Sequence, residues 1–187
     1  KKEIFEFFCF IISLIGVVIR SYVAGYAPKG TSGRVSKQVA EILNTKGIYS
    51  LINPLYLGNF FIFLGMILYT KIWWFILISI ILFWLYYTSI IFAEEKFLKE
   101  KFGEIFLNYY KNTPAIIPKF KNWQRPDLSF SFKNVINREF QTLSGTVWGF
   151  TLIDFLIQIS THKKYFDFFW MKFFIFCLFI YLIILII

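Results

Sequence analysis

Long, uninterrupted blocks of apolar residues are the feature that most restricts the fold of this chain. One block runs from Ile72 to Ala93, and another from about Phe166 to Ile187. As helices, blocks of about 20 apolar residues match the ~30 Å hydrocarbon core of a bilayer. Of the 187 residues, 58% are hydrophobic and 23% aromatic, which is too apolar for a soluble domain. We therefore expect an integral membrane protein.

Three further apolar blocks are shorter or carry polar residues. They run from Ile4 to about Val23, from Leu55 to Tyr69 and from Gly145 to Ile159. With the two longer blocks they predict an all-α fold of about five transmembrane helices, in a single domain over residues 1–187. Only Thr70-Lys71 separates the second span from the third, so these two helices are expected to form a central hairpin. The last two spans are expected to form a C-terminal hairpin over residues 145–187.

Ionisable residues inside the spans are candidates for pairing or for function. Asp154 and Lys172 lie within the fourth and fifth spans, and residues at such depth usually face the bundle interior and find partners. We expect them to pair with each other, with a substrate role as the alternative. Arg20 lies near the end of the first span, where an arginine can extend to the headgroups or contact a ligand.

The central hairpin has a consequence for function, because it returns the chain to the side of the membrane from which it came. The pair Asn53-Pro54 precedes the hairpin and the pair Glu94-Glu95 follows it. The residue before a proline avoids the helical region, whereas proline suits the first turn of a helix. A helix is therefore expected to begin near Pro54, and the two polar pairs are expected to meet.

The first turns of this helix carry polar and small side chains. Tyr56 and Asn59 are three residues apart and share one face, and Gly58 lets another group approach the backbone closely. The alternative is an ordinary helix start at a membrane surface.

The connections between the spans are strongly basic, and the formal net charge is +9. Two long polar connections lie on one side of the predicted membrane, and they hold most of the lysines and arginines. Basic residues gather in cytoplasmic loops, so these connections are expected to be cytoplasmic. The segment from Lys121 to Ser144 is expected to be a surface cap at that end, and the run from Ser36 to Gly47 a short amphipathic helix. Nothing in the sequence resembles a nucleic-acid-binding module.

Cysteine and histidine do not form a metal-site pattern. Cys9 and Cys177 lie inside apolar blocks and are expected to be packing residues. His162 is the sole histidine and has no second ligand nearby in the sequence. No metal is expected.

Two motifs in order across the hairpin resemble a known family. They are GIYSLINPLYLGNFFIFLG from Gly47, and AEEKFLKEKFGEIFLNYYKNTPAIIP, which ends at Pro118. They are similar to the membrane methyltransferases related to isoprenylcysteine carboxyl methyltransferase and to the phospholipid methyltransferases. The resemblance covers the core from 47 to 118. The flanking sequences are similar to a bacterial branch that includes a lipid A phosphate O-methyltransferase, and an inner-membrane location is implied.

The resemblance implies that S-adenosylmethionine binds at the cytoplasmic end of the hairpin. The residues implied for cofactor binding come from both motifs and are Tyr49, Asn53, Pro54, Tyr56, Gly58, Glu94 and Glu95. Carboxylates suit a cofactor that carries an ammonium and a sulfonium, and aromatic rings suit its adenine and its cation. The candidate catalytic residues are Glu95, Asn53 and Arg20, with positioning expected to carry most of the catalysis.

One departure from the family pattern keeps an alternative function open. The family's Arg-His is Ile52-Asn53 here, and isoleucine cannot replace a guanidinium that binds an anion. The leading hypothesis is methyl transfer to a membrane-embedded lipid or lipidated acceptor, at an anionic oxygen of a phosphate or carboxylate. The alternatives are a non-catalytic membrane scaffold with the same fold and a phospholipid amine N-methyltransferase.

Overall fold

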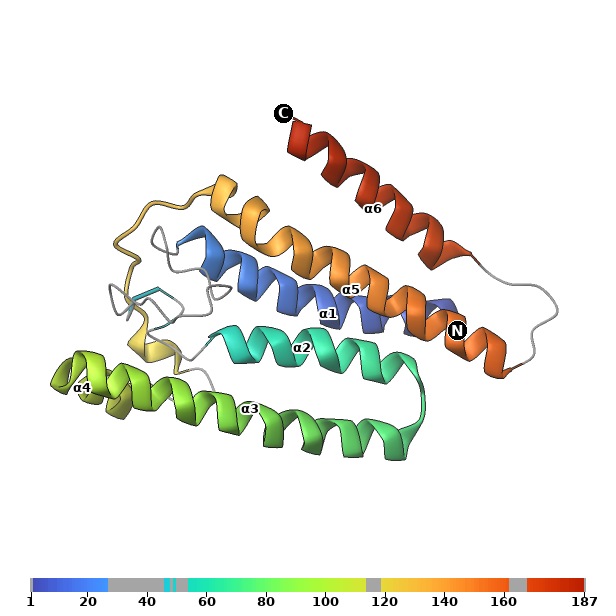
Figure 1. Cartoon of the computed structure of the whole chain (residues 1–187). Helices are drawn as coiled ribbons and strands as arrows, with labels where there is room; N and C mark the ends of the chain where they lie inside the picture. The colour runs from blue at the N-terminus through green and yellow to red at the C-terminus, as the bar shows by residue number, and fades with distance from the viewer. Residues whose placement is uncertain are drawn as a thin grey trace.

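The computed structural model describes residues 2–26, 46–47, 49, 54–113, 119–161 and 168–186. Of these described residues 86% are helical, and no strand occurs among them. Figure 1 shows the helices as a bundle of elongated rods. In chain order they are α1 (Lys2–Gly25), α2 (Pro54–Tyr69), α3 (Trp73–Phe102), α4 (Glu104–Asn112), the short 3-10 helix η2 (Phe120–Asn122), α5 (Phe132–Ser160) and α6 (Phe169–Ile186).

The all-α membrane fold predicted from the apolar blocks is confirmed. Helices α1, α3 and α5 are long and apolar enough to cross a membrane, and α2 and α6 contribute shorter apolar stretches. The central hairpin is also confirmed, because α2 begins at Pro54 and ends at Tyr69, and α3 follows after a three-residue connection. Lys71 has a positive φ of 60 degrees in that connection. This left-handed conformation gives the chain its sharp reversal.

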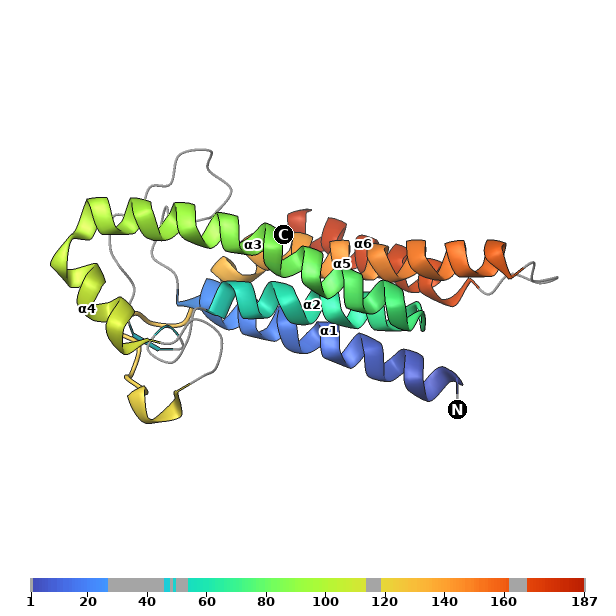
Figure 2. The same ribbon diagram turned by 90° about the horizontal axis from the view of Figure 1, so that it is seen from below.

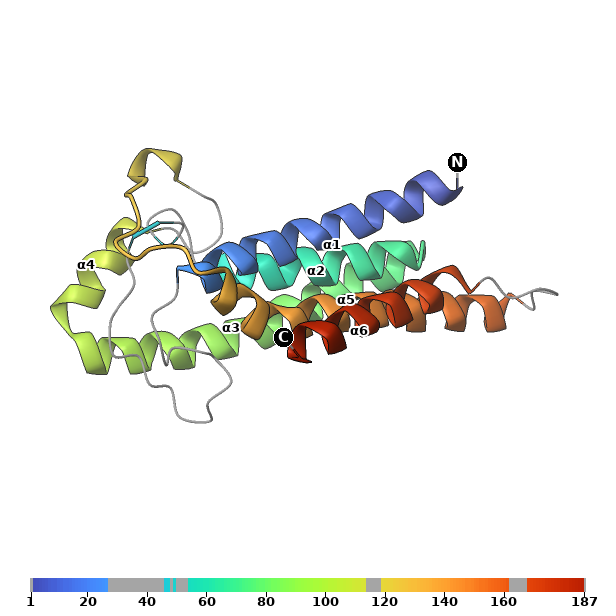
Figure 3. The same ribbon diagram turned by 90° about the horizontal axis from the view of Figure 1, so that it is seen from above.

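The bundle has two chemically different ends. At the loop end, α1 ends while α2 and α5 begin; at the turn end, α2 passes into α3 and α5 ends. Helix α3 is the longest of the described helices. Its length of about 45 Å exceeds the hydrocarbon core, which is about 30 Å thick. Figures 2 and 3 show its last turns extending beyond the start of α2 at the loop end, where α4 bends away. Glu94 and Glu95 follow the apolar stretch of α3, in its last three turns.

Glycine allows α1 and α2 to pack closely. A Cβ on Gly65 would lie 2.2 Å from the Ser13 Oγ and 2.4 Å from the carbonyl oxygen of Cys9. A Cβ on Gly16 would lie 2.3 Å from the carbonyl oxygen of Gly58. Small residues are typical of helix crossings in membranes, where backbones must approach without a hydrophobic driving force. Ser13 strengthens the crossing by donating to the carbonyl oxygen of Ile62 at 2.8 Å.

One boundary differs from the expectation. The fourth membrane helix begins at Phe132 rather than near Gly145, so the predicted surface cap ends at Ser131. Ser131 is the N-cap, and its side chain accepts a hydrogen bond from the backbone N–H of Asn134 at 3.3 Å. Serine is among the residues preferred at this position. Hydropathy marks only the apolar half of this helix, because its first turns are polar. The amphipathic helix predicted from Ser36 lies outside the described residues.

The expected pairing of Asp154 with Lys172 is replaced by other contacts. Asp154 accepts hydrogen bonds from the Tyr69 hydroxyl at 2.9 Å and from Gln158 Nε2 at 2.5 Å, while Lys172 is exposed on α6. Trp170 packs against Tyr69 and stacks on Phe150, whose ring centroid lies 4.9 Å away. Cys9 is fully buried in the same cluster, in agreement with its predicted packing role.

Candidate functional site

The first turn of α2 and the acidic pair of α3 are brought together at the loop end. The Tyr56 hydroxyl, from the first turn of α2, donates a hydrogen bond to Glu94 Oε2, which lies past the apolar part of α3. Tyr56 is only 8% exposed, whereas Glu94 and Glu95 are half-buried. Tyr87 precedes Glu94 on the same helix, and its ring centroid lies 5.7 Å from that of Tyr56. Two carboxylates and two phenol rings therefore share this corner.

Arg20 lies beside this corner and is tied to two other helices. Its Nε and Nη2 donate to the two carboxylate oxygens of Glu139 on α5, at 2.8 and 3.0 Å. Its Nη1 donates to Asn59 Oδ1 on α2 at 2.6 Å. Such a two-point geometry is the strong form of an ion pair. The guanidinium therefore joins α1, α2 and α5 and is neutralised by Glu139.

Two tyrosines complete the loop end from the connections and from α4. The Tyr109 hydroxyl donates to the backbone carbonyl of Tyr49 at 3.0 Å. Burial raises the pKa of Tyr109 to about 12, and it also raises the pKa of Tyr49, an effect that the Tyr109 and Glu94 side chains increase. Arg20 and Arg138 act on the pKa of Tyr49 in the opposite direction. Both phenols are therefore neutral hydrogen-bonding groups at physiological pH.

Two other predicted site residues, Pro54 and Gly58, lie in the first turns of α2. Pro54 is fully buried at the start of α2. The face of Gly58 is filled by α1, because a Cβ there would lie 2.7 Å from Arg20 Cγ and 3.0 Å from the carbonyl oxygen of Gly16. The close approach predicted at Gly58 is thus made by another helix, and its role toward a cofactor stays a prediction. Asn53 lies outside the described residues.

Sequence reasoning missed Glu139 and Tyr109 as members of the site. Glu139 is 119 positions from Arg20 in the chain and lies in the segment expected to be a surface cap, so no local pattern joined the two. Its 6% exposure in a polar stretch is the property that distinguishes it, and that is visible only in three dimensions. No group of three or more possible metal ligands occurs among the described residues.

The sequence of the chain is similar to one family of known proteins. A family model described as phospholipid methyltransferase matches residues 7–105, which is more than half of the chain. The chain belongs to the phospholipid methyltransferase family. Searches of curated proteins and of solved structures gave no match.

Membership of the phospholipid methyltransferase family assigns the general activity. The protein is a membrane methyltransferase that acts on lipids or lipidated substrates. The matched region contains most of α1 and all of α2 and α3, and therefore Arg20, Tyr56 and the acidic pair. Helices α5 and α6 lie beyond it, so Glu139 comes to the methyltransferase core from outside the family match.

Proposed function

We propose that this protein transfers a methyl group from S-adenosylmethionine to an anionic oxygen of a membrane-embedded lipid. The contact between Tyr56 and Glu94 carries the proposal, because it joins the two motif-bearing segments at one end of the bundle. S-adenosylmethionine would supply an electrophilic methyl group on a sulfonium. The donor set fits this cofactor: two half-buried carboxylates stand beside two phenol rings, and both suit a cation.

In this proposal the chain's own residues act mainly by orientation. Glu94 and Glu95 would hold the ammonium, and Tyr56 fixes one oxygen of Glu94 so that its carboxylate cannot rotate freely. Tyr49 and Asn53 precede α2 in the sequence, and we propose that they also contact the cofactor. Methyl transfer needs the nucleophile, methyl and sulfur in line, so holding two reactants in place supplies most of the rate.

The charge of the loop end supports an anionic acceptor. Exposed basic residues on the described part of this end are Lys96, Lys99, Lys101, Lys111, Lys119, Lys121, Arg125 and Lys133. A lipid phosphate or carboxylate gains from such a surface, whereas an amine headgroup does not. Between the two anions we favour a lipid phosphate, as the similarity of the flanks to a bacterial branch suggests. The basic residues also favour a cytoplasmic loop end in a multi-pass bacterial inner-membrane protein.

Two measurements test this function. Purified protein in detergent is expected to bind S-adenosylmethionine in equilibrium dialysis, with Glu104→Gln as a control, because Glu104 is exposed on α4. Absence of binding at millimolar cofactor would overturn the proposal. Lipid mass spectrometry of cells with and without the gene is expected to show one added methyl on a phosphate-bearing lipid. Methylated ethanolamine headgroups would instead identify an amine N-methyltransferase.

A second candidate function is a non-catalytic membrane scaffold. Two observations favour it: the family's Arg-His is Ile52-Asn53 here, and Arg20 is already neutralised by Glu139. Cofactor binding without methyl transfer to any membrane lipid would support the scaffold. Methylation of a lipid by the purified protein would exclude it.

A further inference from the structure

A small pocket that opens outward lies at the turn end, between α5 and α6. Its empty space is about 240 Å³, including the part open to the outside. The side chains that matter are Asp154, Phe155, Gln158, Phe168 and Trp170. All of them lie beyond the residues that match the family model. Tyr56 and Tyr69 stand near opposite ends of α2, so the pocket and the Tyr56–Glu94 corner are separated by nearly the length of that helix.

Asp154 gives this pocket its charge. Its Oδ1 accepts from the Tyr69 hydroxyl, which itself accepts from Trp170 Nε1 at 3.0 Å, and its Oδ2 accepts from Gln158 Nε2. These donors are neutral, and no lysine or arginine in the described part of the chain forms an ion pair with Asp154. A carboxylate has about four lone-pair positions, so each oxygen can accept one further bond. The pocket therefore offers a negative charge held in a fixed orientation.

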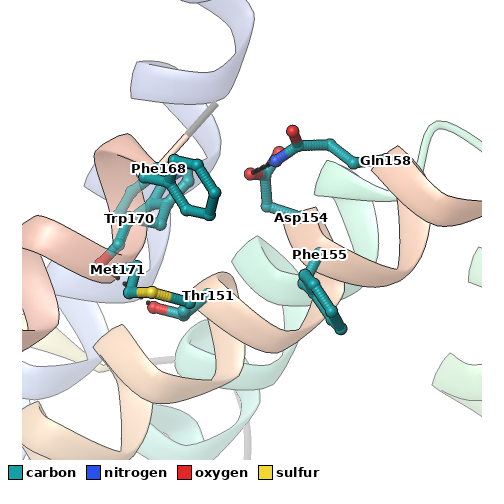
Figure 4. A pocket seen from close by; sticks show the side chains of 7 residues that line it. All are labelled: Thr151, Asp154, Phe155, Gln158, Phe168, Trp170 and Met171. Atoms are coloured by element: carbon teal, nitrogen blue, oxygen red, sulfur yellow. Dashed lines mark hydrogen bonds between the residues drawn. The ribbon is translucent and has the colours of Figure 1, made fainter. Parts of the chain in front are cut away.

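Aromatic rings form the opposite wall. Figure 4 shows Phe168 and Trp170 on the α6 side, across the gap from Asp154 and Gln158, with Phe155 lower on α5. Phe168 is 48% exposed and Phe155 41%, so the pocket opens outward from the bundle. The faces of aromatic rings attract cations. Trp170 is buried in this wall, so the exposed ring opposite Asp154 is that of Phe168. A carboxylate opposite an exposed aromatic ring is the chemistry that recognises an ammonium group.

The pocket lies at the level of a membrane surface. Tyr69, the partner of Asp154, is the last residue of α2, and the exposed Trp73 and Trp74 begin α3 directly after the connection. In the same connection Lys71 forms an ion pair with Glu6 at 3.6 Å. Tryptophans and tyrosines gather in this way at the headgroup layer. The pocket is therefore within reach of lipid headgroups in the leaflet opposite the methyltransferase site.

We propose that this pocket binds a primary ammonium group at the turn-end membrane surface. Its N–H groups would donate to the open lone pairs of Asp154, while its charge would face the ring of Phe168. A quaternary ammonium has no N–H and would lose the contacts with the carboxylate. The source of the ammonium is either an ethanolamine lipid headgroup or a free amine. The proposal concerns binding alone and is independent of methyl transfer.

The test uses the full chain in nanodiscs and lipid retention measured by native mass spectrometry. Wild-type protein is expected to retain ethanolamine phospholipid at least tenfold over choline or glycerol phospholipid of the same chain length. Asp154→Asn keeps the shape of the side chain and is expected to abolish this preference. Phe168→Leu removes a half-exposed ring and is expected to lower retention severalfold, even if Asp154→Asn fails to fold. Lys172→Gln, on the exposed face of α6, is the matched control and should change nothing.

The source of the amine is separated by competition. Displacement of the lipid by millimolar free ethanolamine, with no preference among headgroups at equilibrium, assigns the site to free amines. Unchanged preference in both Asp154→Asn and Phe168→Leu overturns the proposal. The connection beyond α5 also carries Lys163 and Lys164. A double variant changes both lysines to glutamine. If an amine binds to this variant and not to the wild type, the proposal is overturned, because a lysine of the chain then occupies the pocket in the wild type.

Discussion

Among the single residues at the loop end, the acidic pair has the most direct bearing on cofactor binding. Glu94 is oriented by Tyr56, whereas Glu95 is half-buried and shows no hydrogen bond to another described side chain. A half-buried carboxylate without such a partner retains its full capacity to accept from a bound ammonium. Loss of the Glu95 carboxylate should therefore weaken cofactor binding more than loss of the Glu94 carboxylate.

Glu95→Gln is expected to weaken binding of S-adenosylmethionine by about 1.5–3 kcal/mol, which is tenfold or more, because a charge-assisted hydrogen bond is lost. Isothermal titration calorimetry in detergent measures this change. His162→Ala is the control, since the sequence places His162 beyond the far end of α5. Equal losses in the two variants would show that the cofactor site is elsewhere.

The contact between Arg20 and Glu139 is expected to stabilise the bundle as a pair. The two side chains are 19% and 8% exposed, so removing one partner leaves a charge in a poorly solvated place. Glu139→Ala should cost about 3 kcal/mol. The double variant Arg20→Met with Glu139→Leu should recover much of this loss, since it leaves no unpaired charge. Thermal unfolding in detergent measures both, and additive losses would contradict the coupling.

Among the elements, the crossing of α1 and α2 determines how the rest of the bundle is arranged. These two helices make the most extensive contact between described elements, whereas α3 touches α2 much less. The tightest points are Gly65 against Cys9 and Ser13, and Gly16 against Gly58. The backbone carbonyl oxygens at these points cannot move aside as a flexible side chain can. Added side-chain volume must therefore separate the helices.

Gly65→Ala is expected to destabilise the protein by about 1–3 kcal/mol through overpacking. Gly145→Ala is the matched control, because a Cβ there meets nothing within 4 Å. Gly145 lies within α5. Alanine is the better helix former, so this change should be neutral or stabilising by less than about 1 kcal/mol. Apparent melting temperatures in one detergent compare the two, and a similar loss in both would mean that helix packing is not the cause.

The helices were predictable where one physical signal dominates. Apolar length located the three candidate membrane spans and the two shorter apolar helices, and Pro54 marked the start of α2, as a proline in the first turn does. The start of α5 was missed because polar turns carry no hydropathy signal. In the site, the hairpin was enough to predict that the segments of Tyr56 and Glu94 meet. The pairing of Arg20 with Glu139 was not predictable, since it depends on how α5 packs against α1.

In the whole molecule, α5 contacts the family-matched helices α1 and α2 at opposite ends of the bundle. At the loop end α5 contributes Glu139 to Arg20, and at the turn end it contributes Asp154 to Tyr69. Both acidic residues contact side chains from the matched region, 7–105. Helix α5 is therefore bonded to α1 at the loop end and to α2 at the turn end. Glu139 is therefore buried and Asp154 half-buried, each beside a polar side chain of the matched region.

The weak anchoring of α3 has a consequence for how the enzyme senses its lipid surroundings. Only 11% of the apolar window of α3 is buried, yet this helix carries the acidic pair, while Tyr56 is on the firmly packed α2. A helix held mainly by lipid adjusts its tilt when the hydrocarbon thickness changes. The rate of methyl transfer should accordingly pass through an optimum as the acyl chains of the bilayer are lengthened. The stability of the protein should stay the same over this range. Assays in bilayers of graded chain length would show this, and a flat profile would mean that α3 is held by contacts other than those with α2.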